Sequence, residues 1–216
     1  MSNVKPGLYF SLHGIDGSGK TTVAYGLQRY ITEELGERAI NVREPGGTVE
    51  AELLRDLYKG NNFTPLALYH LMAAARAELI AKVVKPALAA GTHVITDRNF
   101  LCSVAYQGID LGFEWLMDQM DHQLYADTSI LLDVSLSAAT NRRASRGEDE
   151  DTFDYGQVAD HYSTLVHRDA IDYSVPTSNS TLTQVQTQCN AIVNKSIKER
   201  RLMAMFQPLG DHERPL

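Results

Sequence analysis

The sequence has 216 residues, of which 44% are hydrophobic and 22% charged, as is ordinary for a soluble globular protein of one large or two small domains. Its formal net charge of −7, from 20 basic and 27 acidic residues, argues against non-specific nucleic-acid binding, which needs a basic surface. The two cysteines, Cys102 and Cys189, match no metal-binding spacing, and we expect reduced thiols. We find no signal peptide and no apolar run near the roughly 18 residues of a membrane span, so we expect a cytoplasmic protein that contacts no membrane.

Apolar runs alternate with segments of helical periodicity along most of the chain. In chain order, the sequence predicts a strand at 8–13, a helix at 20–35, a strand at 39–42, helices at 49–59 and 65–84, a strand at 92–97, helices near 101–107 and 112–124, a strand at 129–134, helices at 136–146 and 156–166, a weak strand within 170–178 and a helix at 181–198. This order is typical of an α/β domain with a mostly parallel sheet. We expect one domain over residues 1–200, with an arginine-rich flap at about 141–154 and a C-terminal tail at 201–216.

The segment GIDGSGKTT at 14–22 follows the first predicted strand and opens the first predicted helix. It fits the pattern G-x-x-x-x-G-K-[ST], in which backbone N–H groups and a helix N-terminus bind phosphate oxygens. Lys20 is expected to reach the outer phosphates of a nucleotide, and the Thr21 hydroxyl to bind Mg²⁺. The expected nucleotide-binding residues are Gly14, Asp16, Gly17, Ser18, Gly19, Lys20, Thr21 and Thr22. The alternative is a flexible glycine-rich turn between a strand and a helix.

The predicted strand at 92–97 ends in Asp97, and Arg98 follows immediately. Both side chains would lie at the carboxyl end of the sheet, where α/β folds bind ligands. Asp97 is therefore a candidate second anchor for Mg²⁺, through water. The Arg98 guanidinium suits bidentate contact with a phosphate. The alternatives are an ordinary strand-ending acid and a surface salt bridge.

With these segments in order, the chain resembles the thymidylate kinases. The matching segments are GIDGSGKTT (14–22), REPGGT (43–48), AAAR (73–76), TDRNFLCSVAYQG (96–108), ILLDVS (130–135) and NRRASRGE (141–148). Many proteins share the first segment, but its combination with REPGGT and AYQG is much more specific. The resemblance implies a three-layer P-loop NTPase fold with a five-stranded parallel sheet. It further implies a homodimer that uses ATP and Mg²⁺ to phosphorylate a deoxynucleoside monophosphate, with dTMP as the expected acceptor.

The resemblance also implies roles for single residues. Asp16 matches the carboxylate that hydrogen-bonds the 3′-hydroxyl of the acceptor, and Arg98 matches the arginine that grips its phosphate. Arg76 matches the arginine that donates to O4 of the pyrimidine, and Tyr106 the aromatic ring that disfavours ribonucleotides. The expected acceptor-binding residues are Asp16, Arg43, Met72, Arg76, Arg98, Ser103 and Tyr106. The expected catalytic residues are Lys20, Arg98, Arg142 and Arg146.

The last two of these arginines lie in the flap, which matches the lid of the family. Arg142 and Arg146 are four residues apart, so on a helix both could clamp one phosphate chain. A phosphate oxygen is already largely ionised at neutral pH, so the transfer needs no general base. The cations would instead position two anions and neutralise their repulsion.

Three positions depart from the pattern of the family. Met72 stands where a phenylalanine usually stacks on the pyrimidine, Asn99 replaces the usual aromatic residue or histidine after Asp97-Arg98, and 151–154 reads DTFD in place of DRFE. The base therefore stays open between thymine, uracil and a 5-modified uracil. A nucleoside kinase is a weaker alternative, because it needs a base to deprotonate a hydroxyl. A P-loop switch protein is weaker still, because it needs no acceptor pocket.

Overall fold

The centre of the molecule is a sheet of five parallel strands in the order β2-β3-β1-β4-β5. A computed structural model describes residues 6–59, 61–147 and 154–206. The strands are β1 (Tyr9–His13), β2 (Ala39–Arg43), β3 (His93–Asp97), β4 (Thr128–Asp133) and β5 (Tyr173–Pro176). The first four begin and end within one residue of the predicted strands. The predicted α/β class and five-stranded parallel sheet are confirmed.

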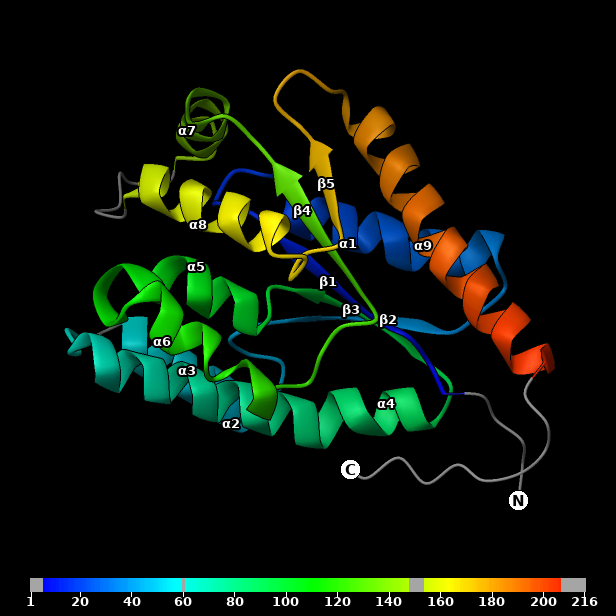
Figure 1. The fold of residues 1–216 in the computed structure, drawn as a ribbon, viewed down its shortest axis with the longest axis horizontal. Coiled ribbons are helices and arrows are strands. Elements are labelled where there is room, and N and C mark those ends of the chain that lie inside the picture. Colours follow the sequence, from blue (N-terminus) through cyan, green and yellow to red (C-terminus); the bar gives the residue numbers. More distant parts are fainter. Residues whose placement is uncertain (1–5, 60, 148–153, 207–216) are drawn as a thin grey trace.

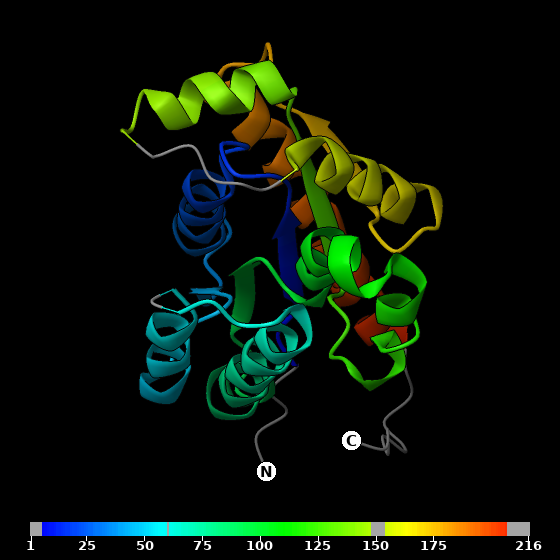
Figure 2. The same cartoon turned by 90° about the vertical axis from the view of Figure 1, so that its left-hand side faces the viewer.

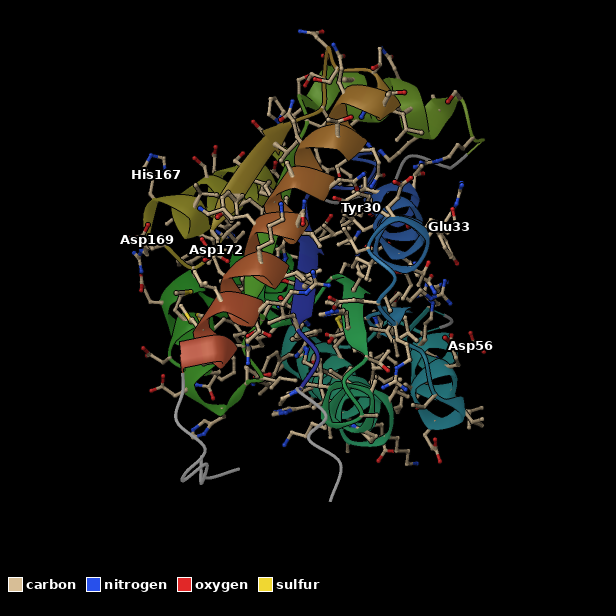
Figure 3. All side chains as sticks on the ribbon, turned by 90° about the vertical axis from the view of Figure 1, so that its right-hand side faces the viewer. Tyr30, Glu33, Asp56, His167, Asp169 and Asp172 are labelled. Carbon is tan, nitrogen blue, oxygen red and sulfur yellow. The ribbon has the colours of Figure 1, made fainter. Side chains whose placement is uncertain are left out.

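Helices cover both faces of this sheet (Figures 1 and 2). They are α1 (Lys20–Arg29), α2 (Val49–Lys59), α3 (Pro65–Leu79), α4 (Lys85–Ala89), α5 (Phe100–Leu111), α6 (Phe113–Met117), α7 (Leu136–Ala144), α8 (Tyr155–His167) and α9 (Leu182–Phe206). A π-helical turn at Tyr30–Glu34 extends α1, and another at Ile80–Val84 joins α3 to α4. Figure 3 shows α9 beside α1 on one face, with Tyr30 and Glu33 at the end of α1.

Alternate residues of the central strand enter separate cores, because successive side chains of a strand point to opposite faces. Phe10 of β1 is fully buried in a core with Leu27 of α1 and Val193 of α9. Tyr9 points the other way and packs with Leu79 of α3. Parallel sheets covered on both faces have such continuous apolar strands, which is why the strands were predictable. Within the described ranges, no helix has both the length and the apolar character that a membrane crossing requires.

Two helices near the middle of the chain differ from the prediction. We expected a helix at 101–107, but α5 begins at Phe100 and continues to Leu111. The side chain of Asn99 accepts a hydrogen bond from the Leu101 N–H at 2.9 Å and so caps its start, while Gly112 ends it at a φ of 92°. The predicted helix at 112–124 is accordingly reduced to the five residues of α6, followed by a 3₁₀ turn at Met120–His122.

Two further boundaries were also predicted wrongly. α7 ends at Ala144 instead of continuing to residue 146, and Gly147 follows with a φ of 69°. α9 continues to Phe206, so the first six residues of the expected tail at 201–216 are helical. Residues 148–153 of the expected flap and 207–216 of the expected tail lie outside the described residues.

The strand register brings the predicted site segments together. β1 lies at the centre of the sheet, between β3 and β4. Leu12 of β1 pairs with Asp97 of β3, and His13 pairs with Leu131 of β4. The loop that follows β1 therefore begins beside the end of β3, at the carboxyl edge of the sheet.

Candidate functional site

The loop between β1 and α1 has a backbone that glycine favours. Gly14, Gly17 and Gly19 have φ values of 135°, 91° and 97°. A Cβ on Gly17 would lie only 2.6 Å from the carbonyl oxygen of Ala139, so that position also lacks room for a side chain. Gly19 precedes α1 and offers no side-chain cap, which leaves the first N–H groups of the helix and the positive end of its dipole for an anion.

Lys20 is buried at the start of α1 and is held inside the loop. Its Nζ donates to the carbonyl oxygens of Gly14 and Ile15, each at 3.0 Å, and lies 3.9 Å from Oδ1 of Asp16. Burial, together with the positive charge of Arg98, lowers the pKa of Lys20 to about 8. An anion in the loop would favour the charged amine and counteract this shift.

Thr21 and Asp97, the two expected metal-binding residues, are in contact. The Thr21 hydroxyl donates to Oδ2 of Asp97 at 2.5 Å. The other carboxylate oxygen, Oδ1, is buried and has no hydrogen-bond partner among the described residues. A hydroxyl beside a free carboxylate oxygen fits a hydrated divalent cation. The described part of the chain holds no group of three His, Cys, Asp or Glu side chains suited to a metal, so water and ligand oxygens would complete the coordination.

Asp16, in the loop after β1, and Arg98, directly after β3, form an ion pair. Nη2 of Arg98 donates to Oδ1 of Asp16, and the hydroxyl of Tyr155 donates to Oδ2 at 3.2 Å. Burial alone would raise the pKa of Asp16, but the charges of Arg98 and Lys20 outweigh it and hold the pKa below its ordinary value. The guanidinium of Arg98 lies over the Tyr106 ring, with Cζ 5.1 Å from the centroid. The structure thus brings together Asp16, Arg98 and Tyr106, three expected acceptor-binding residues, and adds a contact with Tyr155 that the sequence did not suggest.

The backbone of Arg98 adopts a left-handed conformation that few non-glycine residues adopt. Its φ is 77°. Its N–H donates to the Leu12 carbonyl at 3.1 Å, and its own carbonyl accepts from the Thr96 hydroxyl at 2.6 Å. These bonds hold the turn after β3 in place. A strained residue that structure holds so firmly is a feature of functional sites.

Arg76 of α3 forms a buried ion pair that the sequence did not reveal. Its Nε donates to Oε2 of Glu44 at 2.6 Å, and its Nη2 donates to the Ser103 hydroxyl at 2.8 Å. Glu44 follows β2, and burial raises the pKa of its carboxyl although Arg76 opposes the shift. The expected base-reading residues Arg76 and Ser103 therefore meet. Met72, one turn earlier on α3, is half-buried.

Gln107 is a further candidate that sequence reasoning missed. It lies one helical turn after Ser103 on α5 and is 7% exposed. Neither Oε1 nor Nε2 of its amide has a hydrogen-bond partner among the described residues. A buried amide without partners is costly, and such groups call for an explanation such as a bound ligand. Its position in the AYQG segment was the available signal, but its burial without partners is visible only in the fold.

Arg142 and Arg146 are not arranged as predicted. Because α7 ends at Ala144, Arg146 lies beyond the helix and is exposed, so the two arginines do not share a helical face. Arg142 donates to the carbonyl oxygens of Gly17 at 3.2 Å and Thr177 at 2.6 Å. Its guanidinium therefore lies against the loop backbone. The neighbouring arginine, Arg143, lies over the ring of Tyr155.

Arg43, another expected acceptor-binding residue, pairs in register with Asp97, but its side chain bonds to α2. It ends β2, its side chain is exposed, and its Nη2 donates to Oε2 of Glu52 on α2 at 3.3 Å. Glu52 also accepts a hydrogen bond from the N–H of Gly47 at 2.9 Å. Arg43 thus links β2 to α2 through an exposed ion pair.

The chain is similar to thymidylate kinases in both sequence and structure. The family model described as thymidylate kinase matches residues 12–190. The thymidylate kinase of Mycoplasma genitalium is 34% identical over 175 residues, which cover 75% of this chain and 83% of that protein. The thymidylate kinase of Hahella chejuensis is 34% identical over 196 residues, which cover 85% of this chain and 94% of that protein. The crystal structure of thymidylate kinase from Ehrlichia chaffeensis matches with a TM-score of 0.70 at 26% identity, over 88% of this chain and 100% of that one. This chain therefore belongs to the thymidylate kinase family.

Proposed function

We propose that this protein transfers the terminal phosphoryl group of ATP to dTMP, forming dTDP and ADP. The observation that carries the proposal is the ion pair between Asp16, inside the phosphate-binding loop, and Arg98, directly after β3. The pair adds a second set of charged groups beside Lys20, and a protein that only binds a nucleotide does not need it. Membership in the family supports ATP as the donor and dTMP as the acceptor.

On the donor side, the loop backbone and Lys20 bind the phosphates of ATP. Thr21 and Asp97 hold Mg²⁺, which supplies charge neutralisation on the phosphate oxygens. Oδ1 of Asp97, which has no hydrogen-bond partner in the described part of the chain, supports this assignment, because a water of the hydrated ion would satisfy it. Arg142, already bonded to the Gly17 carbonyl, and Arg146 add positive charge near the phosphates.

On the acceptor side, Arg98 grips the phosphate of dTMP and Asp16 accepts the 3′-hydroxyl. Gln107 and Ser103 lie one helical turn apart on α5, and with Arg76 they offer the donors and acceptors that the edge of a pyrimidine needs. The attacking phosphate oxygen is already ionised, so these residues position and neutralise two anions without a general base. In this proposal residues 1–200 form the kinase domain.

A second candidate acceptor is a 5-modified deoxyuridine monophosphate. Met72 is the observation that favours it, because a half-buried methionine on α3 packs less selectively than an aromatic ring. A coupled assay of ADP release across dTMP, dUMP, dCMP, dGMP, dAMP and 5-hydroxymethyl-dUMP decides between the two. We expect the highest kcat/KM with dTMP. A higher value with 5-hydroxymethyl-dUMP would favour the second candidate, and no turnover with any acceptor would overturn the kinase assignment.

The role of Arg98 is tested by Arg98→Ala. Turnover should be lost because the acceptor phosphate loses its cation, while the affinity for ATP measured by calorimetry should stay within about threefold of the wild type. Arg168→Ala is the matched control, since Arg168 pairs with Glu114 at the surface and should not affect turnover. A collapse of ATP affinity in Arg98→Ala would contradict the assignment of Arg98 to the acceptor.

The homodimer that the family resemblance implies is also a proposal, as is the cytoplasmic location. An exposed apolar stripe on α2 supports the dimer: Val49, Leu53 and Leu57 are spaced four residues apart and are 76%, 65% and 45% exposed. Sedimentation should give about twice the mass of the chain, and Leu53→Glu should give monomers. A wild-type monomer at micromolar concentration would refute the dimer.

Two free, buried thiols, Cys102 and Cys189, fit a reducing compartment.

A further inference from the structure

Tyr155, the first residue of α8, contacts two charged groups from distant parts of the chain. Its hydroxyl donates to Oδ2 of Asp16 at 3.2 Å. On its ring lies the guanidinium of Arg143, from α7, with Cζ 4.2 Å from the centroid. The ring of Tyr106 meets it edge-on, with centroids 6.4 Å apart. Tyr155 is 9% exposed, so these contacts are made largely away from water.

The hydrogen bond from Tyr155 fixes the orientation of the Asp16 carboxylate. Arg98 occupies Oδ1 and Tyr155 occupies Oδ2, so rotation of the carboxylate about its Cβ–Cγ bond would break both contacts. Each carboxylate oxygen can accept two hydrogen bonds, so the group still has capacity for another donor. The side chain of Asp16 is 40% exposed, which leaves that capacity within reach of a ligand.

Tyr155 also links this carboxylate to α7. A cation over an aromatic face is attracted by the negative face of the ring, and the attraction strengthens as water is excluded. The hydroxyl and the face of one ring therefore hold a carboxylate of the phosphate-binding loop and an arginine of α7 at a fixed separation. Arg142, the residue before Arg143, bonds to the same loop through the Gly17 carbonyl.

We propose that Tyr155 is a positioning residue for the acceptor: its hydroxyl presents the Asp16 carboxylate to the 3′-hydroxyl of the deoxynucleotide, and its ring holds Arg143 beside the phosphate-binding loop. This proposal rests on the proposed function, since it takes Asp16 as the acceptor of that hydroxyl. It assigns two separable roles to one side chain. Removal of the hydroxyl should therefore affect the acceptor sugar, and removal of the ring should also affect the donor phosphates.

The first role is tested by comparing wild type and Tyr155→Phe, each with an acceptor that has the 3′-hydroxyl and with one that lacks it. The two acceptors are dTMP and 3′-deoxythymidine monophosphate, which lacks the hydroxyl that Asp16 accepts. Tyr155→Phe should lower kcat/KM for dTMP about tenfold or more, as expected for the loss of one hydrogen bond to a charged group. With 3′-deoxythymidine monophosphate the loss of kcat/KM should be below about twofold, because this acceptor has no 3′-hydroxyl for Asp16 to bind. The KM for ATP should not change, whereas the thermal midpoint of the ligand-free protein should fall by a few degrees, because the same hydrogen bond is present without ligand.

Tyr155→Leu tests the second role, because it removes the ring beneath Arg143 as well as the hydroxyl. It should raise the KM for ATP at least threefold above that of Tyr155→Phe, since the loss of a partly desolvated cation–π contact corresponds to about that factor or more. Tyr125→Phe is the matched control, since Tyr125 is 57% exposed in the loop before β4 and should change neither parameter.

Each result that contradicts the proposal has a distinct signature. Equal losses with dTMP and its deoxy analogue in Tyr155→Phe would overturn the positioning role, since the hydroxyl would then act independently of the acceptor 3′-hydroxyl. Equal KM values for ATP in Tyr155→Phe and Tyr155→Leu would overturn the role of the ring. Absence of wild-type turnover with dTMP would overturn the proposed function itself, whatever the variants do.

Discussion

Removal of the Glu44 carboxylate should destabilise the protein far more than removal of a surface carboxylate. The side chains of Glu44 and Arg76 are 4% and 7% exposed, and their ion pair measures 2.6 Å. Glu44→Ala leaves a buried guanidinium with Ser103 as its remaining polar contact in the described structure. Breaking a buried pair from one side typically costs about 3–5 kcal/mol. For a chain of this size that corresponds to a fall in the thermal midpoint of about 6–20 °C.

The measurement is urea denaturation of wild type and three variants without ligand. Glu44→Gln keeps an oxygen that can accept from Arg76 but removes the charge, so its loss should lie between wild type and Glu44→Ala. Glu114→Ala breaks the ion pair with Arg168, in which the side chains are 69% and 45% exposed, and should cause no measurable loss.

A Glu44→Ala variant that is no less stable than Glu114→Ala would show that the buried guanidinium does not depend on Glu44. In that case water or a rearranged neighbour would solvate Arg76 at little cost. A second reading comes from kinetics: with Arg76 no longer held by Glu44, the KM for dTMP should rise in Glu44→Ala, whereas the KM for ATP should stay near that of wild type.

Three further predictions concern other buried groups. Burial, with the charge of Lys20, lowers the pKa of His13 to about 3, so the unfolded chain takes up the proton first as the pH falls below about 6.5. As the pH falls from 6.5 to 3, His13 should therefore lower the unfolding free energy by up to about 1.4 kcal/mol per pH unit. Denaturation of His13→Asn at several pH values should give a shallower slope of unfolding free energy against pH. A slope equal to that of wild type would contradict the lowered pKa of His13. Gln107→Leu should stabilise the ligand-free protein by about 1 kcal/mol and raise the KM for dTMP at least tenfold, because it removes a buried amide that lacks a partner among the described residues and that the base would satisfy. A destabilised Gln107→Leu variant with normal KM would mean that the amide serves packing alone. Asp97→Asn should raise the half-saturating Mg²⁺ concentration about tenfold in an activity titration; an unchanged titration would remove Asp97 from the metal site.

Those parts of the candidate site that consist of neighbouring residues in a recognisable motif could be predicted from the sequence. The segment from Gly14 to Thr22 follows β1, and the pair Asp97-Arg98 lies at the end of β3; strand ends in a parallel sheet meet at one edge. The strands themselves were predictable because burial on both faces makes them continuously apolar. Asp16 was assigned to the acceptor by family resemblance, and the structure adds its contact with Arg98.

The partnerships between distant residues could not be predicted. Glu44 and Arg76 are 32 residues apart, and only the packing of α3 against the end of β2 buries them together. Tyr155 and Asp16 are 139 residues apart, and no spacing rule relates them. The end of α7 at Ala144 has a local cause: tight turns follow it, in which the N–H groups of Arg146 and Gly147 donate to the carbonyls of Arg143 and Ala144.

The left-handed backbone at Arg98 sets selection for stability against selection for activity. A φ of 77° costs an arginine about 1–3 kcal/mol that a glycine would not lose. Selection for thermal stability alone would therefore favour glycine at this position. A copy of the gene that is no longer selected for activity could accept the same substitution. Retention of arginine at this position in a variant library would report that the reaction was still being selected. The residue thus serves as a marker of function in any laboratory evolution of this protein.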